Sequence, residues 1–320
     1  MGLWYDKNAP VFDQKESKSL LHSFMVHGYR GFTINPYQGC QHRCGYCYAT
    51  YEWSPEFYDK IYAKSNAPEV LENQLKANRS KSRTIGPVMV SSATDAYQPS
   101  ELKFGLTRKC VKVLQKYAVP YYVFTKSTII LRDLNLHKQY KHNCFIVWSI
   151  TTCDENVRRL VEPGTPPSSK MFETIKKFSS SGIRCGVNID PILPLITDSP
   201  KDIKSILDNC AEAGVQYVFG AILRLRLDIW ERMKTIFNSL GLRKGIKEYE
   251  KIFHFTEPLQ SRHNVLADPF YSNSILKKLE ADVNDRGMYF DFPDLAGSNC
   301  VKASKPGGDS KQLSLMNFIE

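Results

Sequence analysis

The most informative stretch of this chain reads Asn35-Pro-Tyr-Gln-Gly-Cys40-Gln-His-Arg-Cys44-Gly-Tyr46-Cys47-Tyr-Ala49. It places Cys40, Cys44 and Cys47 at Cys-x3-Cys-x2-Cys spacing, with Tyr46 directly before the third cysteine. Thiols this close together indicate a metal site. Iron–sulfur clusters normally take four cysteines, and the next cysteine along the chain is Cys110. A cluster held by three cysteines leaves one position open, which is typical of a site that binds a substrate or cofactor.

These residues resemble the radical S-adenosylmethionine (SAM) superfamily, whose signature is Cys-x3-Cys-x-aromatic-Cys. The resemblance implies a 4Fe-4S cluster held by the three cysteines, with Tyr46 beside the cofactors and SAM chelated by the fourth iron. It also implies a reductant such as a flavodoxin or ferredoxin. Reduction would split SAM into methionine and a 5′-deoxyadenosyl radical, which abstracts a hydrogen atom from the substrate.

A zinc knuckle is the alternative interpretation of the cysteines. His42 or a distant cysteine would then complete a tetrahedron of ligands around zinc. The chain lacks a second Cys/His pair at zinc-finger spacing, and this weighs against the zinc interpretation.

Composition sets bounds on the class of protein. The 320 residues, 42% of them hydrophobic, suffice for one large α/β domain or two smaller ones. We expect a cytoplasmic protein without a membrane segment, because the sequence shows neither a long apolar run nor a signal-peptide pattern. The nine cysteines are too sparse for a disulfide scaffold. The net charge of +10 is open to two explanations, a nucleic-acid partner or solvated helix faces.

Short apolar segments alternate with longer amphipathic ones after the cysteine run, as in a chain of βα units. The expected strands are Phe32 to Asn35, Val88 to Ser91, Tyr121 to Thr125, Phe145 to Ile150, Cys185 to Ile189 and Gln216 to Ile222. Helices are expected at Leu106 to Tyr117, around Met171 to Phe178, and after Ser199, a predicted N-cap followed by Pro200. Gly214 would end the last of these helices.

Six βα units match the partial (β/α)6 barrel that is typical of radical SAM enzymes. We therefore expect three regions: an N-terminal extension at residues 1–29, the barrel at 30–227, and a helical cap with a polar tail at 228–320. The tail would be the Ser-, Gly- and Lys-rich segment from Gly297 to Gln312. In barrels of this kind the chemistry lies at the carboxyl ends of the strands.

Each predicted strand carries polar residues at its carboxyl end. Ser92, Thr94 and Asp95, after the second strand, offer acceptors for the SAM ammonium, or alternatively cap the turn into the next helix. Lys126 directly follows a strand and suits an anion at the barrel mouth. At the end of the fifth strand, Asn188 could face adenosine and Asp190 could face SAM or substrate, although both residue types also cap turns.

The chain is further similar to the spore photoproduct lyase family, often labelled DNA repair photolyase, over roughly Arg30 to Arg226. The similarity rests on the cysteine run and on Thr94-Asp95-Ala-Tyr97-Gln-Pro99, Thr125-Lys126, Arg132-Asp133, Ser149-Ile-Thr-Thr152, Arg159-Leu-Val-Glu162-Pro163 and Leu223-Arg224-Leu225. It implies that Lys126 and Ser149 bind the SAM carboxylate. It also makes Tyr48 a candidate radical relay, although a phenol there can be merely a stacking surface. Tyr48, Tyr97 and Asp190 are the candidate catalytic residues.

One position departs from that family. Where the lyase has Cys-Thr-Ser-Asp, with the cysteine as hydrogen donor, this chain has Ser92-Ala-Thr94-Asp95. A serine O–H bond is too strong for that donation, so thymine-dimer reversal is not expected. The sequence therefore predicts a lyase-like radical SAM enzyme with an unidentified substrate, nucleic acid being one option. The alternative is a non-catalytic zinc or iron–sulfur protein that binds nucleic acid.

Overall fold

The structure, a computed structural model, describes residues 10–26, 29–50, 56–81, 85–261 and 263–295. Its centre is a seven-stranded sheet in the order β10-β9-β8-β7-β6-β3-β2. Neighbouring strands from β3 to β10 are parallel, and β2 pairs with β3 as an antiparallel hairpin. The strands are β2 (His22–Val26), β3 (Tyr29–Ile34), β6 (Val88–Val90), β7 (Tyr121–Thr125), β8 (Cys144–Ser149), β9 (Cys185–Ile192) and β10 (Tyr217–Ile222).

The six predicted strands are confirmed, each within a few residues of its expected bounds. Every residue of β7 and β8 is buried, as expected of parallel strands whose two faces are both covered. From β3 to β10 the order of strands in the sheet follows their order in the chain. The sheet ends at β2 and β10, which do not pair with each other, so the predicted partial barrel is confirmed.

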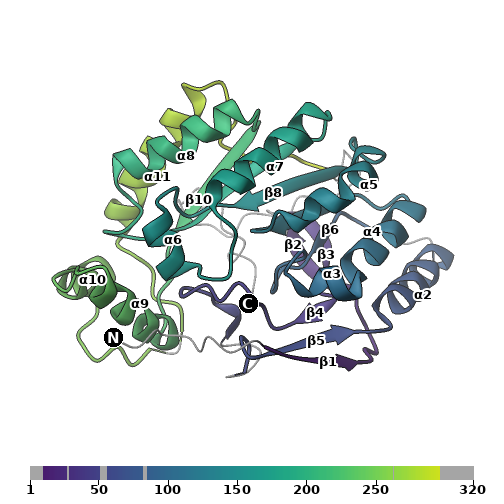
Figure 1. Ribbon diagram of the computed structural model, residues 1–320, viewed down its shortest axis with the longest axis horizontal. Helices are drawn as coiled ribbons and strands as arrows, with labels where there is room; N and C mark the ends of the chain where they lie inside the picture. Colours follow the sequence, from purple (N-terminus) through teal and green to yellow (C-terminus); the bar gives the residue numbers. More distant parts are fainter. Residues whose placement is uncertain (1–9, 27–28, 51–55, 82–84, 262, 296–320) are drawn as a thin grey trace.

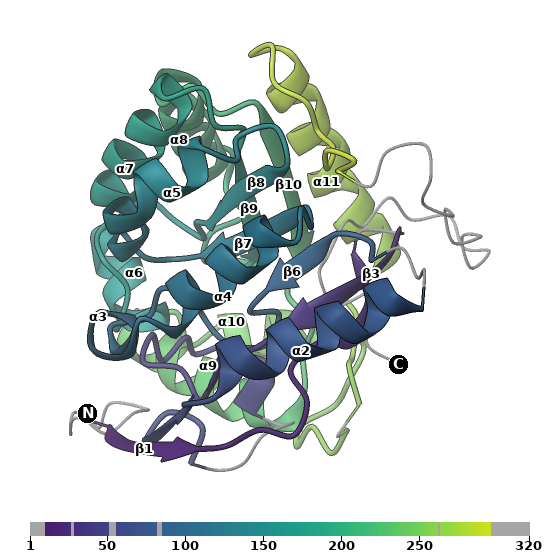
Figure 2. The same ribbon diagram turned by 90° about the vertical axis from the view of Figure 1, so that its right-hand side faces the viewer.

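Helices α2, α4, α5, α7 and α8 lie outside the sheet, while α9 and α10 lie together near one end of it (Figures 1 and 2). None of the described helices is long and apolar enough to traverse a bilayer. The helices are α2 (Ala67–Ser80), α3 (Ser100–Phe104), α4 (Leu106–Lys116), the 3-10 helix η1 (Ile129–Asp133), α5 (Leu134–Lys138), α6 (Glu155–Val161), α7 (Ser168–Ser180), α8 (Pro200–Glu212), α9 (Leu227–Ser239), α10 (Gly245–Ile252) and α11 (Pro269–Asn284).

The N-terminal signals of α8 are confirmed in atomic detail. The Ser199 hydroxyl accepts a hydrogen bond from the backbone N–H of Asp202 at 3.1 Å, and Pro200 occupies the first helical position. Ile203, Leu207 and their neighbours on the same face are buried. Gly214 adopts a φ of +72°, which suits the left-handed conformation that follows many helices.

A second, three-stranded sheet was not predicted. β1 (Val11–Lys15) pairs in parallel with β5 (Lys60–Lys64), and β4 (Tyr37–Gln38) pairs with the other edge of β5. This sheet lies beside the cysteine loop, residues 39–48, which leaves β4 directly. Gly39 has a φ of +83°, and a Cβ there would lie 2.3 Å from the Lys60 carbonyl oxygen. Only glycine therefore allows the loop to start so close to β5.

The segment after α11 fills the interior of the open barrel. Its backbone runs along β10, where the Tyr289 N–H donates to the Gln216 carbonyl oxygen at 2.9 Å. Phe292 then packs among the rings of Tyr122, Phe145 and Phe219, with ring centroids 4.6, 5.4 and 5.5 Å away. Within the described part of the predicted cap, the segment around Phe292 therefore supplies core to the barrel. The predicted polar tail from Gly297 to Gln312 lies outside the described residues.

Candidate active site

A cavity of about 170 Å³ lies at the carboxyl ends of the parallel strands. The cysteine loop and the carboxyl-terminal parts of β7, β8 and β9, together with residues that follow β6, β7 and β10, all reach it. Its lining comprises Cys40, His42, Cys44, Tyr46, Cys47, Tyr48, Ser91, Ser92, Ala93, Thr94, Asp95, Phe124, Thr125, Lys126, Ser149, Asn188, Asp190, Pro191, Leu223 and Arg224. All of the predicted site residues except Tyr97 are among them.

The three cysteines share one wall of this cavity. Cys40 and Cys44 are buried, Cys47 is partly buried, and all three are free thiols. Burial raises the pKa of each thiol. Among the described residues, no three His, Cys, Asp or Glu side chains are arranged to hold a single metal ion. The cysteines therefore line a common space without gathering around one point.

Hydrogen bonds from residues elsewhere in the chain to backbone carbonyls of the cysteine loop hold the loop in place. The Gln98 side chain donates to the Gly39 carbonyl oxygen at 3.0 Å, and the Tyr58 hydroxyl donates to that of Cys44 at 2.5 Å. The Gly164 N–H donates to the His42 carbonyl oxygen at 3.0 Å. A Cβ on Gly164 would lie 2.2 Å from the Gln41 carbonyl oxygen, so this contact requires glycine.

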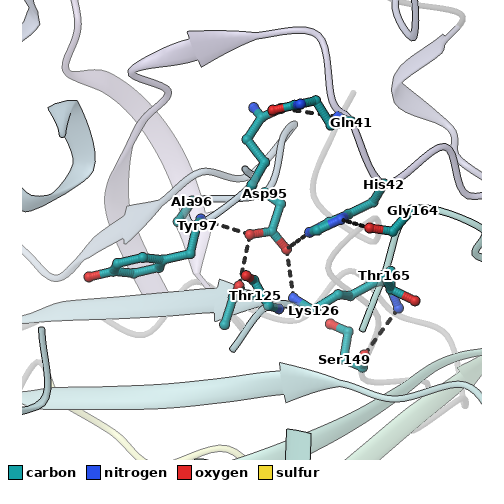
Figure 3. Close-up of polar contacts among 12 residues, drawn as sticks. Gln41, His42, Asp95, Ala96, Tyr97, Thr125, Lys126, Ser149, Gly164 and Thr165 are labelled. Atoms are coloured by element: carbon teal, nitrogen blue, oxygen red, sulfur yellow. Dashed lines mark hydrogen bonds and ion pairs between the residues drawn. The ribbon is translucent and has the colours of Figure 1, made fainter. Parts of the chain in front are cut away.

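Asp95 forms the centre of a buried polar network (Figure 3). One carboxylate oxygen accepts from the Tyr97 N–H and the Thr125 hydroxyl, both at 2.7 Å. The other oxygen accepts from the Lys126 N–H at 2.6 Å and faces His42 Nε2 at 3.1 Å. Burial raises the pKa of Asp95, but His42 and these donors outweigh it and hold the pKa below its usual value.

His42 is the partner of Asp95, a role that the sequence analysis did not give it. Its Nδ1 donates to the Gly164 carbonyl oxygen at 3.0 Å. Burial lowers the pKa of His42, but the Asp95 carboxylate outweighs this and raises it. Both ring nitrogens thus face oxygen atoms, and His42 links the cysteine loop to the strand ends. Asp95, predicted to accept from the SAM ammonium, already has protein donors on both oxygens.

Lys126 pairs with a second buried carboxylate, that of Glu162 at the end of α6. The Lys126 Nζ lies 2.9 Å from Glu162 Oε1 and donates to the Ser149 carbonyl oxygen at 3.2 Å. The Tyr46 hydroxyl also donates to Glu162, and Lys126 lies over the Tyr46 ring at 5.6 Å from its centroid. Burial opposes both charges, yet their attraction lowers the pKa of Glu162 and raises that of Lys126. The predicted cation is therefore present at the cavity, together with a counterion that was not predicted.

Three buried oxygen atoms at the cavity have no hydrogen-bond partner among the described residues. They are the hydroxyl oxygens of Ser91 and Thr94 and the amide oxygen Oδ1 of Asn188, all of them buried. Buried polar atoms are nearly always paired, so partners from a bound molecule are expected here. Amino and hydroxyl groups such as those of SAM would supply the donors that an amide oxygen needs.

Ser92 and Tyr48 lie together at the edge of the cysteine loop. The Ser92 hydroxyl accepts from the Thr33 hydroxyl at 2.9 Å and from the Asn35 amide at 3.3 Å. The Tyr48 hydroxyl donates to the Ser92 carbonyl oxygen. The structure thus brings the predicted relay candidate, Tyr48, beside the serine that departs from the lyase pattern.

Asp190 and Arg224 contribute opposite charges to the lining from β9 and from the residues after β10. Burial lowers the pKa of Arg224, and the Asp190 carboxylate opposes that effect. Arg224 was quoted in the sequence analysis only as part of a shared motif. Its position directly after a buried strand, Tyr217–Ile222, was the available signal for a place at the cavity.

Tyr97 lies away from the cavity. Its side chain is fully buried, and its hydroxyl lies 2.9 Å from His137 Nε2 and donates to Asp133 at 3.2 Å. These partners belong to η1 and α5, so the ring packs between the sheet and its outer helices. Tyr97 thus contributes only its backbone N–H to the network around Asp95.

The model of the radical SAM superfamily matches residues 34–210, which span the cysteine loop and the strands from β6 to β9 together with α8. Among curated proteins, an uncharacterized protein of Mycobacterium tuberculosis is 30% identical over 204 residues, which are 60% of this chain and 59% of that protein. An uncharacterized protein of Methanocaldococcus jannaschii is 32% identical over 171 residues, 52% of this chain and 62% of that protein. The chain thus spans less than two thirds of the length of these relatives.

Solved structures of spore photoproduct lyase have the same fold. A point mutant of that lyase superimposes with a TM-score of 0.69 and 14% identity over 88% of this chain and 82% of the lyase. Another mutant, solved with bound AdoMet and dinucleoside spore photoproduct, gives a TM-score of 0.65 and 14% identity over 82% and 76% of the two chains. A radical SAM methyltransferase from Sphaerobacter thermophilus gives 0.53 and 10% identity over 82% and 65%.

Proposed function

Because the chain belongs to the radical SAM superfamily, we propose that it is an enzyme that holds a 4Fe-4S cluster and SAM in this cavity and abstracts hydrogen from a further substrate. One observation carries the proposal. A single cavity gathers the three cysteines with polar residues from five successive strand ends. The family implies SAM and an iron–sulfur cluster, and the three-cysteine signature supports our proposal of the 4Fe-4S type.

The residues fit these two groups. Cys40, Cys44 and Cys47 would hold the cluster. Lys126 and Ser149 would bind the SAM carboxylate, while Thr94 and Asn188 offer their unpartnered acceptors to its amino and ribose groups. When bound, the reduced cluster supplies the electron that cleaves SAM to the 5′-deoxyadenosyl radical.

The protein's own residues would orient SAM and keep water away. The Asp95 carboxylate fixes the backbone of Lys126, and Glu162 fixes its ammonium, so the cation is positioned before SAM arrives. Phe124 and Leu223 line the cavity with apolar surface, which protects a reactive radical from side reactions. Tyr48, next to Ser92, is the candidate relay residue.

Anaerobic reconstitution tests the proposal. The protein should take up iron and sulfide and, when reduced, convert SAM to 5′-deoxyadenosine. Cys44→Ala should abolish both results, whereas Cys110→Ala, which removes a buried cysteine outside the cavity, should retain them. Uptake of zinc in place of iron, or a reduced cluster that yields no 5′-deoxyadenosine, would refute the enzyme proposal.

The substrate class is open between nucleic acid and small molecules or peptides. The net charge of +10 favours nucleic acid, and Ser92 in place of a cysteine argues against repair of the photoproduct itself. DNA and RNA binding measured over a range of salt concentrations separates the two. Binding that weakens steeply with salt supports a nucleic-acid substrate, because each neutralised phosphate releases a counterion. Absent or salt-independent binding would remove that option.

A further inference from the structure

Residues outside the segment that matches the superfamily also hydrogen-bond to the cysteine loop. Helix α9 follows β10 and buries Ile229, Trp230 and Met233 along one face. Its Arg232 points instead to the cysteine loop, with a side chain only 15% exposed. None of the sequence motifs had singled out this arginine.

The Arg232 guanidinium donates to two backbone carbonyls of the cysteine loop. The Arg232 Nε donates to the Gly45 carbonyl oxygen at 2.7 Å, and Nη2 donates to that of Cys47 at 3.1 Å. These two carbonyls lie on either side of Tyr46. Because guanidinium is planar and rigid, two such bonds fix the direction of the intervening backbone. Arg226, just before α9, donates in the same way to the Tyr48 carbonyl oxygen.

Asp228 forms an ion pair with the Arg232 guanidinium. Its Oδ2 lies 3.1 Å from Arg232 Nη2 and accepts from the Thr50 hydroxyl at 2.8 Å. The Thr50 hydroxyl lies 2.9 Å from the Cys47 carbonyl oxygen, which closes the ring of contacts. Arg232 thus contacts the backbone of loop residues Gly45 and Cys47, whereas Asp228 contacts Arg232 and Thr50.

We propose that Arg232 is a positioning residue for the cluster, which fixes the loop around Cys47 and raises the reduction potential of the bound cluster. The inference rests on the proposed function. Reduction adds a negative charge to a cluster, so a nearby cation stabilises the reduced form and a nearby anion destabilises it. Charge and hydrogen bonding around the ligands are recognised determinants of cluster potential. Asp228 acts in the opposite direction and moderates the effect of Arg232.

Four variants separate charge from mere structural support. Arg232→Met removes the cation, and Arg232→Lys keeps the charge without the planar fork. Asp228→Asn leaves Arg232 without its counterion. Lys234→Met is the matched control, because it removes a cation from the same helix whose described partners are Glu231, Glu257 and the Trp230 ring.

The experiment is a redox titration of the anaerobically reconstituted full chain, followed by electron paramagnetic resonance, with iron and sulfide counted for each variant. The midpoint potential should fall in Arg232→Met and rise in Asp228→Asn. Arg232→Lys and Lys234→Met should stay close to the parent. Opposite shifts from Arg232→Met and Asp228→Asn are the result that a purely structural role would not produce.

Several outcomes would overturn the inference. They are an unchanged potential in Arg232→Met, shifts of the same sign in Arg232→Met and Asp228→Asn, or an equal shift in Lys234→Met. If Arg232→Met retains no iron, Asp228→Asn decides: a potential no higher than that of the parent refutes the role of charge. A parent protein that takes up no iron and sulfide overturns the proposed function itself, which is a separate result.

Discussion

Removal of the Lys126 ammonium is the most informative perturbation of this site. Lys126→Met would leave the Glu162 carboxylate buried without its cation, from which it is separated by 2.9 Å. The two side chains are 12% and 1% exposed, so water replaces little of the lost interaction. Breaking a buried ion pair from one side costs about 3–5 kcal/mol. We expect the lower end of that range, because the Tyr46 hydroxyl still donates to Glu162.

The same variant tests the assignment of the SAM carboxylate to Lys126. A hydrogen bond to a charged group is worth about 1.5–3 kcal/mol, so the affinity for SAM should fall by roughly tenfold to a hundredfold. Glu162→Gln should act differently. It destabilises the fold but leaves the lysine without a competing carboxylate, so SAM binding should be retained or tightened. The double variant should recover most of the lost stability and none of the lost affinity.

Urea unfolding at pH 7, followed by circular dichroism, measures the free energy of unfolding. Equilibrium dialysis of SAM against the reconstituted protein measures the affinity for SAM. Equal unfolding midpoints for the parent and Lys126→Met would refute the energetic argument. If Glu162→Gln weakened SAM binding as much as Lys126→Met, Lys126 would act only by supporting the fold, and its contact with SAM would be refuted.

Three further outcomes follow from the fold around the site. Burial lowers the pKa of His137 to about 4, so the unfolded chain takes up the proton first. Stability from this group is complete above about pH 6.5 and falls as the pH drops towards 4, by about 2 kcal/mol at pH 5. His137→Asn should remove that loss in melts at pH 7 and pH 5, and an identical pH dependence in both proteins would contradict it. Gly164→Ala should destabilise by about 1–3 kcal/mol and reduce iron retention, since its Cβ would overlap the Gln41 carbonyl oxygen. An unchanged melt and iron content would show that the loop can move aside. Phe292→Ala should lower the free energy of unfolding by about 3–5 kcal/mol in urea titrations, and a change below about 1 kcal/mol would show that the ring is not part of the core.

The parallel strands and their order were predictable because their signals are local. β7 and β8 are largely apolar runs that end at Thr125 and Ser149, and α8 carries its N-cap and its glycine stop in the sequence. The cavity could be predicted for the same reason. Once parallel strands are aligned, the residues at their carboxyl ends must meet at one edge, as Lys126, Ser149 and Asn188 do.

The remaining features depend on partners that are distant in sequence. β1 is almost wholly exposed and gains its form only by pairing with β5, which begins at residue 60. Glu162 joins the site through its contact with Lys126, and Arg232 does so through its contact with Cys47. No local sequence pattern predicts such pairs. Tyr97 shows the converse. Its motif lies at a strand end, yet the turn at Asp95 directs the ring towards η1 and α5.

The position of Phe292 in the barrel also constrains how the chain is made. The Tyr122 hydroxyl donates to the Pro293 carbonyl oxygen across 171 residues of sequence. During synthesis, every strand of the seven-stranded sheet therefore leaves the ribosome before the segment that contains Phe292. Until then the rings of Tyr122, Phe145 and Phe219 line an unfinished, wettable interior, the kind of exposed apolar surface that leads nascent chains to aggregate or to recruit chaperones. Completion of the barrel must wait for α11 and for Phe292.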